Sequence, residues 1–265
     1  MKKVREIVRK EWSEVFKNRL VIFSVTFMPL IFTAIPLGTL FSMRGLTDTS
    51  GLEAEFGAAL EGLRPLCGPL EGLECSQFLI LQQFMVLFLM MPAIIPITIA
   101  SYSIVGEKTT RTLEPLLATP ITTFELLAGK ALAAVLPALF ASTFSFLVFA
   151  AGTALLATSP AVALQLFSAL WLLAIFVVGP LLSLAGVSLS VMISSRVNDP
   201  RVAEQMAALI VLPVVALFLS QIFGVITINQ TFVLIIAAAL VVVDTALMYF
   251  ATQLFQRETI LTRWK

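Results

Sequence analysis

The chain has 265 residues, of which 59% are hydrophobic and only 12% are charged, about half the charged fraction of a soluble domain. Its net charge of +1, with no basic patch beyond the first 19 residues, argues against a nucleic-acid partner. Because the chain contains no histidine, it cannot build a Ser-His-Asp or Cys-His nucleophile system or a histidine-containing metal or haem site. We therefore predict a membrane protein with no catalytic residue and no metal ligand.

The first 19 residues, MKKVREIVRKEWSEVFKNR, carry apolar side chains at helical spacing and basic side chains on the remaining surface. This pattern predicts an amphipathic helix that lies in the headgroup layer, with its cations near anionic lipid. The alternative is that the segment only fixes the topology of the chain. The first apolar run starts at Leu20 and is about 24 residues long, so it indicates a spanning helix and no cleavable signal peptide.

A spanning helix needs ~20 mostly apolar residues. Six runs of the chain meet this requirement, at residues 20–43, 78–105, 125–157, 161–194, 203–226 and 231–255. Between Lys130 and Arg196 no residue is charged, so this stretch could hold two long helices or three short ones. Its one strong turn signal, ATSPAV at residues 157–162, favours two helices.

The distribution of Lys and Arg supports six spans. If the chain has six spans, 15 basic residues fall on one side of the membrane and two, Arg44 and Arg64, fall on the other. The positive-inside rule then places both termini in the cytoplasm, and we expect the protein in the cell membrane. The predicted fold is a single all-α polytopic membrane domain over residues 1–265.

Residues 44–77 form the predicted external loop, which carries six acidic side chains. An apolar helical face predicts a short amphipathic helix on the outer surface. Its members are Leu52, Phe56, Leu60 and Leu63. Cys67 and Cys75 also lie in this loop, on the oxidising side of the membrane. They either form a disulfide or remain two small unpaired apolar residues.

The predicted cytoplasmic loop at residues 106–124 stands out because its surroundings, EKTTRTLEPLLATPITTFELLAGK at 107–130, keep six charges between two apolar runs. Thr112 can cap a short helix at residues 113–118, which has an apolar face of leucines. Thr122 and Glu125 then fit a capping box that starts the third span. So tightly specified a geometry suggests a docking surface.

Two fragments near this loop, GEKTT at Gly106 and AGKA at Ala128, each match part of a phosphate-binding P-loop. Both fail the full pattern G-x-x-x-x-G-K-[ST], and neither follows a strand. We therefore expect no nucleotide site in this chain.

The same stretch resembles the motif E-x-x-x-G-T-L-E-x-L-L-x-T-P-[IV]-[ST]-x-x-x-[IL]-[IL]-x-G-K of the ABC-2 type permeases, the membrane subunits of ATP-binding-cassette exporters. The matching positions are Glu107, Thr112, Leu113, Glu114, Leu116, Leu117, Thr119, Pro120, Ile121, Thr122, Leu126, Leu127, Gly129 and Lys130. The chain departs from the motif at Arg111, where the family usually has glycine. The resemblance spans the whole chain in its layout of segments, but it is specific only in the stretch of ~24 residues at 107–130.

The resemblance implies that the loop is a coupling helix, which lies in a groove of a separate cytosolic ATPase subunit. The residues it assigns to this coupling are Glu107, Arg111, Thr112, Leu113, Glu114, Leu116, Leu117, Thr119 and Pro120. It also implies a second permease half, in a homodimer or heterodimer, and ATP and Mg²⁺ bound by the partner, with no cofactor in this chain. It does not identify the exported substrate.

Within the predicted spans, Asp244 lies near the middle of the sixth helix, where a charged group costs ~2.5–3.5 kcal/mol on insertion scales. It either belongs to a polar translocation path or fastens two helices as a protonated or hydrogen-bonded side chain. Gln82, Gln83 and Gln221, near the outer ends of two spans, either line an exit or are interfacial glutamines. Prolines interrupt five of the six spans, which suits a bundle that must open.

Two other functions compete with the exporter interpretation. An ion-coupled secondary transporter would use Asp244 for proton or sodium coupling, and a membrane scaffold would use the loop to recruit a cytosolic protein. An intramembrane protease is disfavoured, because a serine type lacks histidine and an aspartyl type needs a second membrane carboxylate.

Overall fold

The computed structural model describes residues 2–44, 67–110, 112, 121–223 and 225–254. Every regular element in these ranges is helical. In chain order they are α1 (Lys2–Val15), α2 (Arg19–Met43), α4 (Gly72–Phe88), α5 (Met90–Thr109), α7 (Thr123–Leu156), α8 (Pro160–Gln165), α9 (Ala169–Leu173), the π-helix η2 (Ala174–Val178), α10 (Gly179–Ser194), α11 (Pro200–Ala207), the 3₁₀-helix η3 (Ala208–Val211), α12 (Leu212–Ile222) and α13 (Gln230–Leu254).

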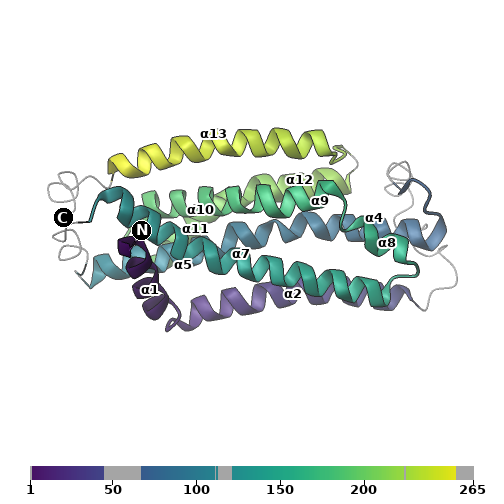
Figure 1. The fold of residues 1–265 in the computed structure, drawn as a ribbon, viewed down its shortest axis with the longest axis horizontal. Coiled ribbons are helices and arrows are strands. Elements are labelled where there is room, and N and C mark those ends of the chain that lie inside the picture. The colour runs from purple at the N-terminus through teal and green to yellow at the C-terminus, as the bar shows by residue number, and fades with distance from the viewer. Residues whose placement is uncertain (1, 45–66, 111, 113–120, 224, 255–265) are drawn as a thin grey trace.

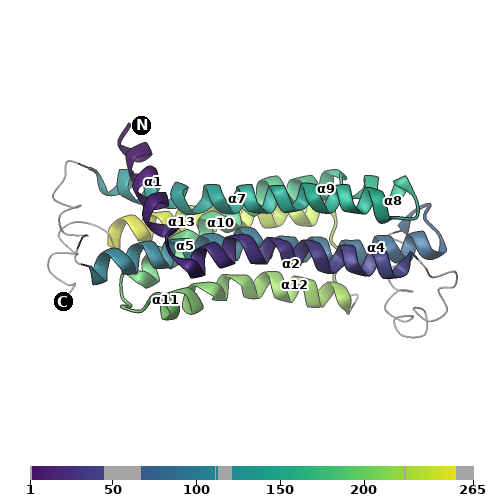
Figure 2. The same ribbon diagram turned by 90° about the horizontal axis from the view of Figure 1, so that it is seen from below.

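The described helices group into six stretches that are long and apolar enough to cross a membrane, which confirms the six predicted spans. They are Val21–Met43, Gly72–Thr109, Thr123–Leu156, Pro160–Ser194, Pro200–Ile222 and Gln230–Leu254. The spans run side by side along the long axis of the molecule, and α1 crosses one end of the bundle (Figures 1 and 2). At that end α5 stops and α7 begins, so the end of α5, the start of α7 and α1 share one end of the molecule (Figure 1).

The centre of the bundle is formed by α5, α7 and α10, which pack against one another. In the most apolar part of the second span 61% of the residues are buried, whereas in the most apolar part of the sixth span only 17% are buried. Close packing of α5 on α10 requires Gly186, because a Cβ there would lie 3.0 Å from Ile97 and 3.1 Å from the carbonyl oxygen of Ala93. Small residues at such crossings let membrane helices approach closely.

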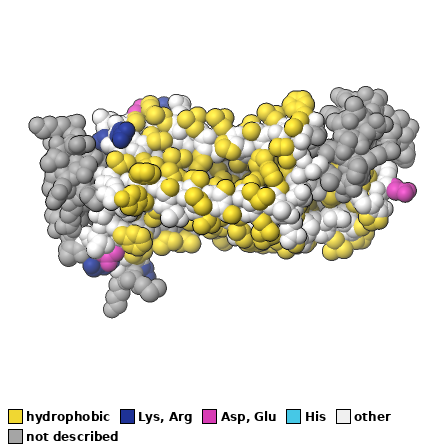
Figure 3. Space-filling view, turned by 90° about the horizontal axis from the view of Figure 1, so that it is seen from above, with side chains coloured by type: hydrophobic (Ala, Val, Ile, Leu, Met, Phe, Trp, Pro, Cys, Tyr) yellow, Lys and Arg dark blue, Asp and Glu magenta, His cyan; other side chains and the backbone are white. Residues whose placement is uncertain are grey.

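The outward faces of the spans are apolar. Large hydrophobic side chains such as Phe140 and Val242 are well exposed, and the hydrophobic side chains cover the middle of the face seen in Figure 3, with charged ones near its ends. A surface of this kind suits contact with lipid, which solvates apolar groups.

The second span begins earlier than predicted. We expected the external loop to reach residue 77, but α4 starts at Gly72, which has a positive φ of 53°. The prediction failed because an apolar run marks only the part of a helix that needs lipid, while polar residues extend the helix beyond it. Cys75 therefore lies in the first turn of α4, where it forms a disulfide with Cys67. The amphipathic helix predicted at Leu52 lies outside the described residues.

The fourth span is a single crossing, as predicted, but it is not one continuous helix. Ser159, before Pro160, is extended at φ −138° and ψ 154°, which ends the third span where the turn signal predicted. The chain then breaks after α8, because Ser168 is also extended, with ψ 151°, before α9 begins. No turn signal in the sequence marked this second break.

Prolines inside the spans leave carbonyls without their usual helical donor, and the structure satisfies them in two ways. Pro96 cannot donate to the carbonyl of Pro92, and the Ser183 hydroxyl of α10 donates to that oxygen at 2.6 Å instead. Near Pro180 and Pro213 the chain adjusts locally, since η2 precedes the first and η3 the second. The prediction that prolines loosen the bundle is thus incomplete, because at Pro96 the freed carbonyl binds a neighbouring helix.

We predict that Ser183→Ala lowers the free energy of unfolding by about 1 kcal/mol, because the Pro92 carbonyl loses its donor. In a Pro96→Ala background the alanine N–H can donate to that carbonyl, so the same substitution is expected to cost less. Unfolding titrations in mixed detergent micelles measure both changes. Ser142→Ala is the matched control, because its hydroxyl bonds only to Leu139 in its own helix. Equal costs of Ser183→Ala in the two backgrounds would contradict the assignment.

Candidate functional site

The most densely charged interior part of the described structure lies where α1, α5 and α7 meet, beside the loop between α5 and α7. Lys130 of α7 is 4% exposed, and its Nζ lies 2.7 Å from Oε1 of Glu11 in α1 and 2.7 Å from Oε2 of Glu107 in α5. The Ser103 hydroxyl of α5 accepts a hydrogen bond from Nζ at 2.8 Å and donates to Glu11. We call Glu11, Ser103, Glu107 and Lys130 the junction cluster.

A second lysine balances the charge of the junction cluster. Lys10 of α1 pairs with Oε1 of Glu107 and lies 3.7 Å from Glu14. Burial by itself lowers the pKa of Lys10, but the hydrogen bond and the negative charge of Glu107 outweigh that effect and raise the pKa above its ordinary value. The two carboxylates of the cluster thus face two ammonium groups, those of Lys130 and Lys10.

Burial makes the junction cluster energetically unlike a surface ion pair. Glu11 and Glu107 are 2% and 3% exposed, so their charges are held away from water and depend on their partners. Removing one partner of a buried pair typically costs 3–5 kcal/mol, because it leaves an uncompensated buried charge. The cluster therefore resists separation of the three helices that contribute to it.

Two close contacts dock α1 on α7 beside the cluster. Ile7 packs directly on Gly129, because a Cβ added to the glycine would lie 2.7 Å from Cγ2 of Ile7. Trp12 donates from its indole nitrogen to the carbonyl oxygen of Ala133 at 2.9 Å. That oxygen lacks a helical donor because Pro137 stands four residues later. The glycine and the proline of α7 thus create the surface that α1 covers.

The start of α7 is fixed by the predicted capping box. The Thr122 hydroxyl accepts a hydrogen bond from the Glu125 backbone at 3.1 Å, and the Glu125 carboxylate accepts one from the Thr122 backbone at 2.9 Å. Lys3 of α1 lies 3.4 Å from the same carboxylate. The first turn of α7 therefore has a defined geometry and a further contact with α1.

The end of α5 is also well specified. The Thr112 backbone donates to the Glu107 carbonyl at 3.0 Å, and the Thr110 and Thr112 hydroxyls lie 3.0 Å apart. Lys108 donates to the backbone oxygens of Ser195 and Val197, beyond the end of α10. The segments flanking the loop are thus tied to α1, to α10 and to each other.

The structure changes the expected role of Glu107 and describes little of the predicted coupling surface. We expected Glu107 to belong to that surface, and the structure places its side chain in the interior, 3% exposed and against Lys130. Thr112 is exposed. The remaining predicted coupling residues, Arg111, Leu113, Glu114, Leu116, Leu117, Thr119 and Pro120, lie outside the described residues.

The predicted intramembrane polar residues do not join the junction cluster. Asp244 is 7% exposed on α13, which packs against α10, and neither carboxylate oxygen has a hydrogen-bond partner among the described residues. Gln82 and Gln83 lie on α4, and Gln221 is buried on α12, which packs against α4. The Gln83 and Gln221 side-chain oxygens also lack a partner within the described chain.

Sequence reasoning missed Glu11 and Ser103 as partners of Lys130. The available signal was Lys130 itself, since a lysine inside a predicted span requires an anionic or polar partner. Its partner Glu11 lies 119 residues away, however, on a helix interpreted as an interfacial element or as a segment that fixes the topology. Among the described residues no cluster of three or more Cys, Asp or Glu side chains could hold a metal ion.

Comparison with known proteins identifies one family. Residues 5–259 match the family described as ABC-2 family transporter protein, so the match covers nearly the whole chain and includes all three helices of the junction. No curated protein matches the chain.

We predict that Lys130→Met lowers the free energy of unfolding by about 3 kcal/mol or more, because two buried carboxylates lose their shared partner. Detergent unfolding measures the loss. Adding Glu11→Gln should recover part of it by removing one of the unpaired charges. Lys3→Met, which removes an exposed partner of Glu125, is the control and should have little effect. The interpretation is wrong if the two methionine variants are equally stable.

Gly129→Ala is expected to loosen α1, at a cost of about 1–3 kcal/mol, because the new methyl group meets the stiff β-branched side chain of Ile7. Hydrogen exchange of the α1 amides should accelerate in this variant. Gly38→Ala is the matched control, since no atom lies within 4 Å of its added Cβ. Unchanged exchange in α1 of Gly129→Ala would show that Ile7 does not depend on this glycine.

Proposed function

The chain belongs to the ABC-2 transporter family, and from this premise we propose that it is the permease subunit of an ATP-driven exporter that couples to a separate cytosolic ATPase through residues 107–130. Its six spans make it a multi-pass membrane protein, and its family makes it a membrane transport component. The observation that carries the proposal is the junction cluster, which ties the two flanks of this loop to each other and to α1.

The junction cluster supports coupling by a mechanical argument. Glu107 ends the span before the loop, and Lys130 lies two turns into the span after it, so their contact holds both flanks of the loop together. The capping box of Thr122 and Glu125 keeps the start of α7 helical. A displacement of the loop by an ATPase would therefore move α5, α7 and α1 together, since separating them means breaking buried ion pairs.

The distribution of basic residues supports the proposed orientation. In the predicted topology, fifteen Lys and Arg residues fall on the side of both termini and of residues 106–124, and under the positive-inside rule this supports a cytoplasmic location for that side. The expected membrane is the cell membrane. ATP and Mg²⁺ would then be bound by the ATPase partner, on the same side as the loop.

A second copy or a similar chain completes the proposed permease. In one chain, α2, α12 and α13 expose many large apolar side chains along their lengths. Exposed apolar faces of this extent suit contact with lipid and also contact with a second permease half. The resemblance of residues 107–130 to the ABC-2 permease motif implies that two such halves work together. The proposal includes a homodimer or a heterodimer.

An ion-coupled secondary transporter is the second candidate, and one observation favours it. The Asp244 carboxylate is buried without a hydrogen-bond partner among the described residues, and intramembrane carboxylates of this kind often belong to ion pathways. Under this candidate, Asp244→Asn abolishes transport driven by an ion gradient in liposomes. Under the exporter proposal, transport needs ATP and the soluble subunit.

We predict that Leu116→Asp with Leu117→Asp lowers co-purification of the ATPase subunit at least about tenfold, because charged side chains would replace the apolar contact face. ATP-dependent transport should fall in parallel. Leu60→Asp with Leu63→Asp, in the loop predicted on the other side of the membrane, is the matched control and should leave the complex intact. Retained binding by the Leu116 and Leu117 double variant would refute coupling through this face.

A further inference from the structure

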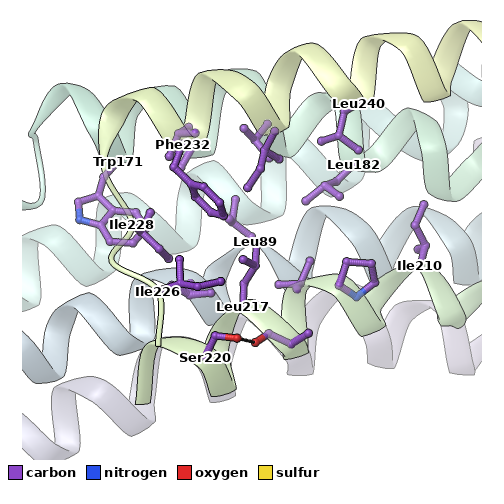
Figure 4. Close-up of a pocket in the computed structure, with 18 residues that line it drawn as sticks. Leu89, Trp171, Leu182, Ile210, Leu217, Ser220, Ile226, Ile228, Phe232 and Leu240 are labelled. Atoms are coloured by element: carbon purple, nitrogen blue, oxygen red, sulfur yellow. Dashed lines mark hydrogen bonds between the residues drawn. The ribbon is translucent and has the colours of Figure 1, made fainter. Parts of the chain in front are cut away.

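A cavity of about 440 Å³ lies between α12 and α13 and is partly open. Figure 4 shows side chains from both helices and from the helices behind them pointing into it. The lining side chains come from α12 and α13 and, behind them, from α4, α9, η2, α10 and η3.

The cavity exists because the last two spans pack against different parts of the bundle. α12 packs mainly against α4 and η3, whereas α13 packs mainly against α10, η2 and α9. The two helices are joined by only a short connection, residues 223–229, and two of its isoleucines close one end of the space (Figure 4). The gap is therefore a feature of helix packing and not of one missing side chain.

The lining offers almost nothing to a polar ligand. No lining side chain is charged. The Ser220 hydroxyl already donates to the carbonyl of Ala216 at 2.6 Å, in its own helix. Apolar cavities of this kind do not retain water, because water finds no hydrogen-bond partners there. The apolar walls of the cavity therefore favour a hydrocarbon ligand.

The size and position of the cavity narrow the choice of hydrocarbon. The lining helices belong to spans, so the space lies within the depth of the bilayer, where lipid chains are the surrounding solvent. A helix with its side chains is ~10–12 Å across and does not fit into this volume. A single flexible chain does fit, since the volume falls in the range of small-ligand sites.

We propose that this cavity binds one acyl chain of a bilayer lipid, which enters between α12 and α13. Lipid chains are as apolar as the walls, so binding is driven by filling the void, because wall atoms beside an empty space lack dispersion contacts. The bound chain bridges two spans that pack poorly against each other. The proposal goes beyond the transport function and does not depend on an ATPase or on export.

The test uses the full chain in phosphatidylcholine nanodiscs that contain a phosphatidylcholine with a diazirine in the middle of one acyl chain. After illumination, mass spectrometry maps the labelled residues. Labelling is expected to concentrate on cavity residues such as Leu217 and Ile236, above that of Val242, which is 69% exposed on α13 and lies outside the cavity. Equal labelling of Leu217 and Val242 would mean that only surface lipid is present, and would overturn the proposal.

A pair of matched variants tests the cavity itself. Ala216→Trp places a large side chain in the space and should lower labelling of Leu217 and Ile236 about fivefold or more, because the volume is filled. Ala238→Trp adds the same side chain at an exposed position of α13 outside the lining and should leave the labelling unchanged. Ser220→Leu, a smaller filling, is the second variant if the tryptophan impairs folding. Unchanged labelling in a folded filling variant contradicts the proposal.

A second copy of the chain is the alternative occupant. Cys67 and Cys75 are joined in a disulfide, so Leu217→Cys introduces a thiol that can report on contacts with another chain. Under the proposal, an oxidant links Leu217→Cys chains no faster than Ala238→Cys chains. Preferential linkage at position 217 would show that another copy fills the cavity, and the lipid site would be rejected.

Discussion

The pairing of the buried Lys130 ammonium group is the interaction on which the junction of α1, α5 and α7 depends. A lysine inside a spanning helix needs anionic partners, and here they come from two other elements, Glu11 of α1 and Glu107 of α5. One charge requirement therefore decides where α1 lies and how α5 and α7 meet beside their connecting loop. The contact of Ile7 with Gly129 depends on the same docking.

Backbone hydrogen bonding in an apolar environment explains a second set of contacts between the spanning helices. A proline in the interior of a spanning helix frees a carbonyl, which lipid cannot satisfy. At Pro96 and Pro137 these carbonyls accept hydrogen bonds from Ser183 and Trp12 of other helices. Prolines that suggested flexible kinks thus also attach helices to one another. In the fourth and fifth spans the chain responds differently, with a π-turn and a 3₁₀-turn beside the prolines.

These constraints divide the molecule into a stiff part and a loosely packed part. The junction of α1, α5 and α7 is held by buried ion pairs, close contacts and a capping box. Away from this junction, α12 and α13 are separated by an apolar cavity with no charged lining side chain. The proposed coupling function uses the stiff part, and the proposed lipid site lies in the loose one, so the two rest on different physical grounds.

The six spans, the capping box and the family could be predicted from the amino-acid sequence, because hydrophobic length, turn chemistry and a local motif are properties of neighbouring residues. The partner of Lys130, the burial of Glu107, the break after α8 and the cavity between α12 and α13 became known only from the packed helices. These features depend on how each helix is rotated and which helix it meets. In a membrane span both the lipid face and the core face are apolar, so the sequence pattern does not say which face turns inward. A contact such as that of Glu11 with Lys130, made across 119 residues, is therefore invisible until the helices are packed.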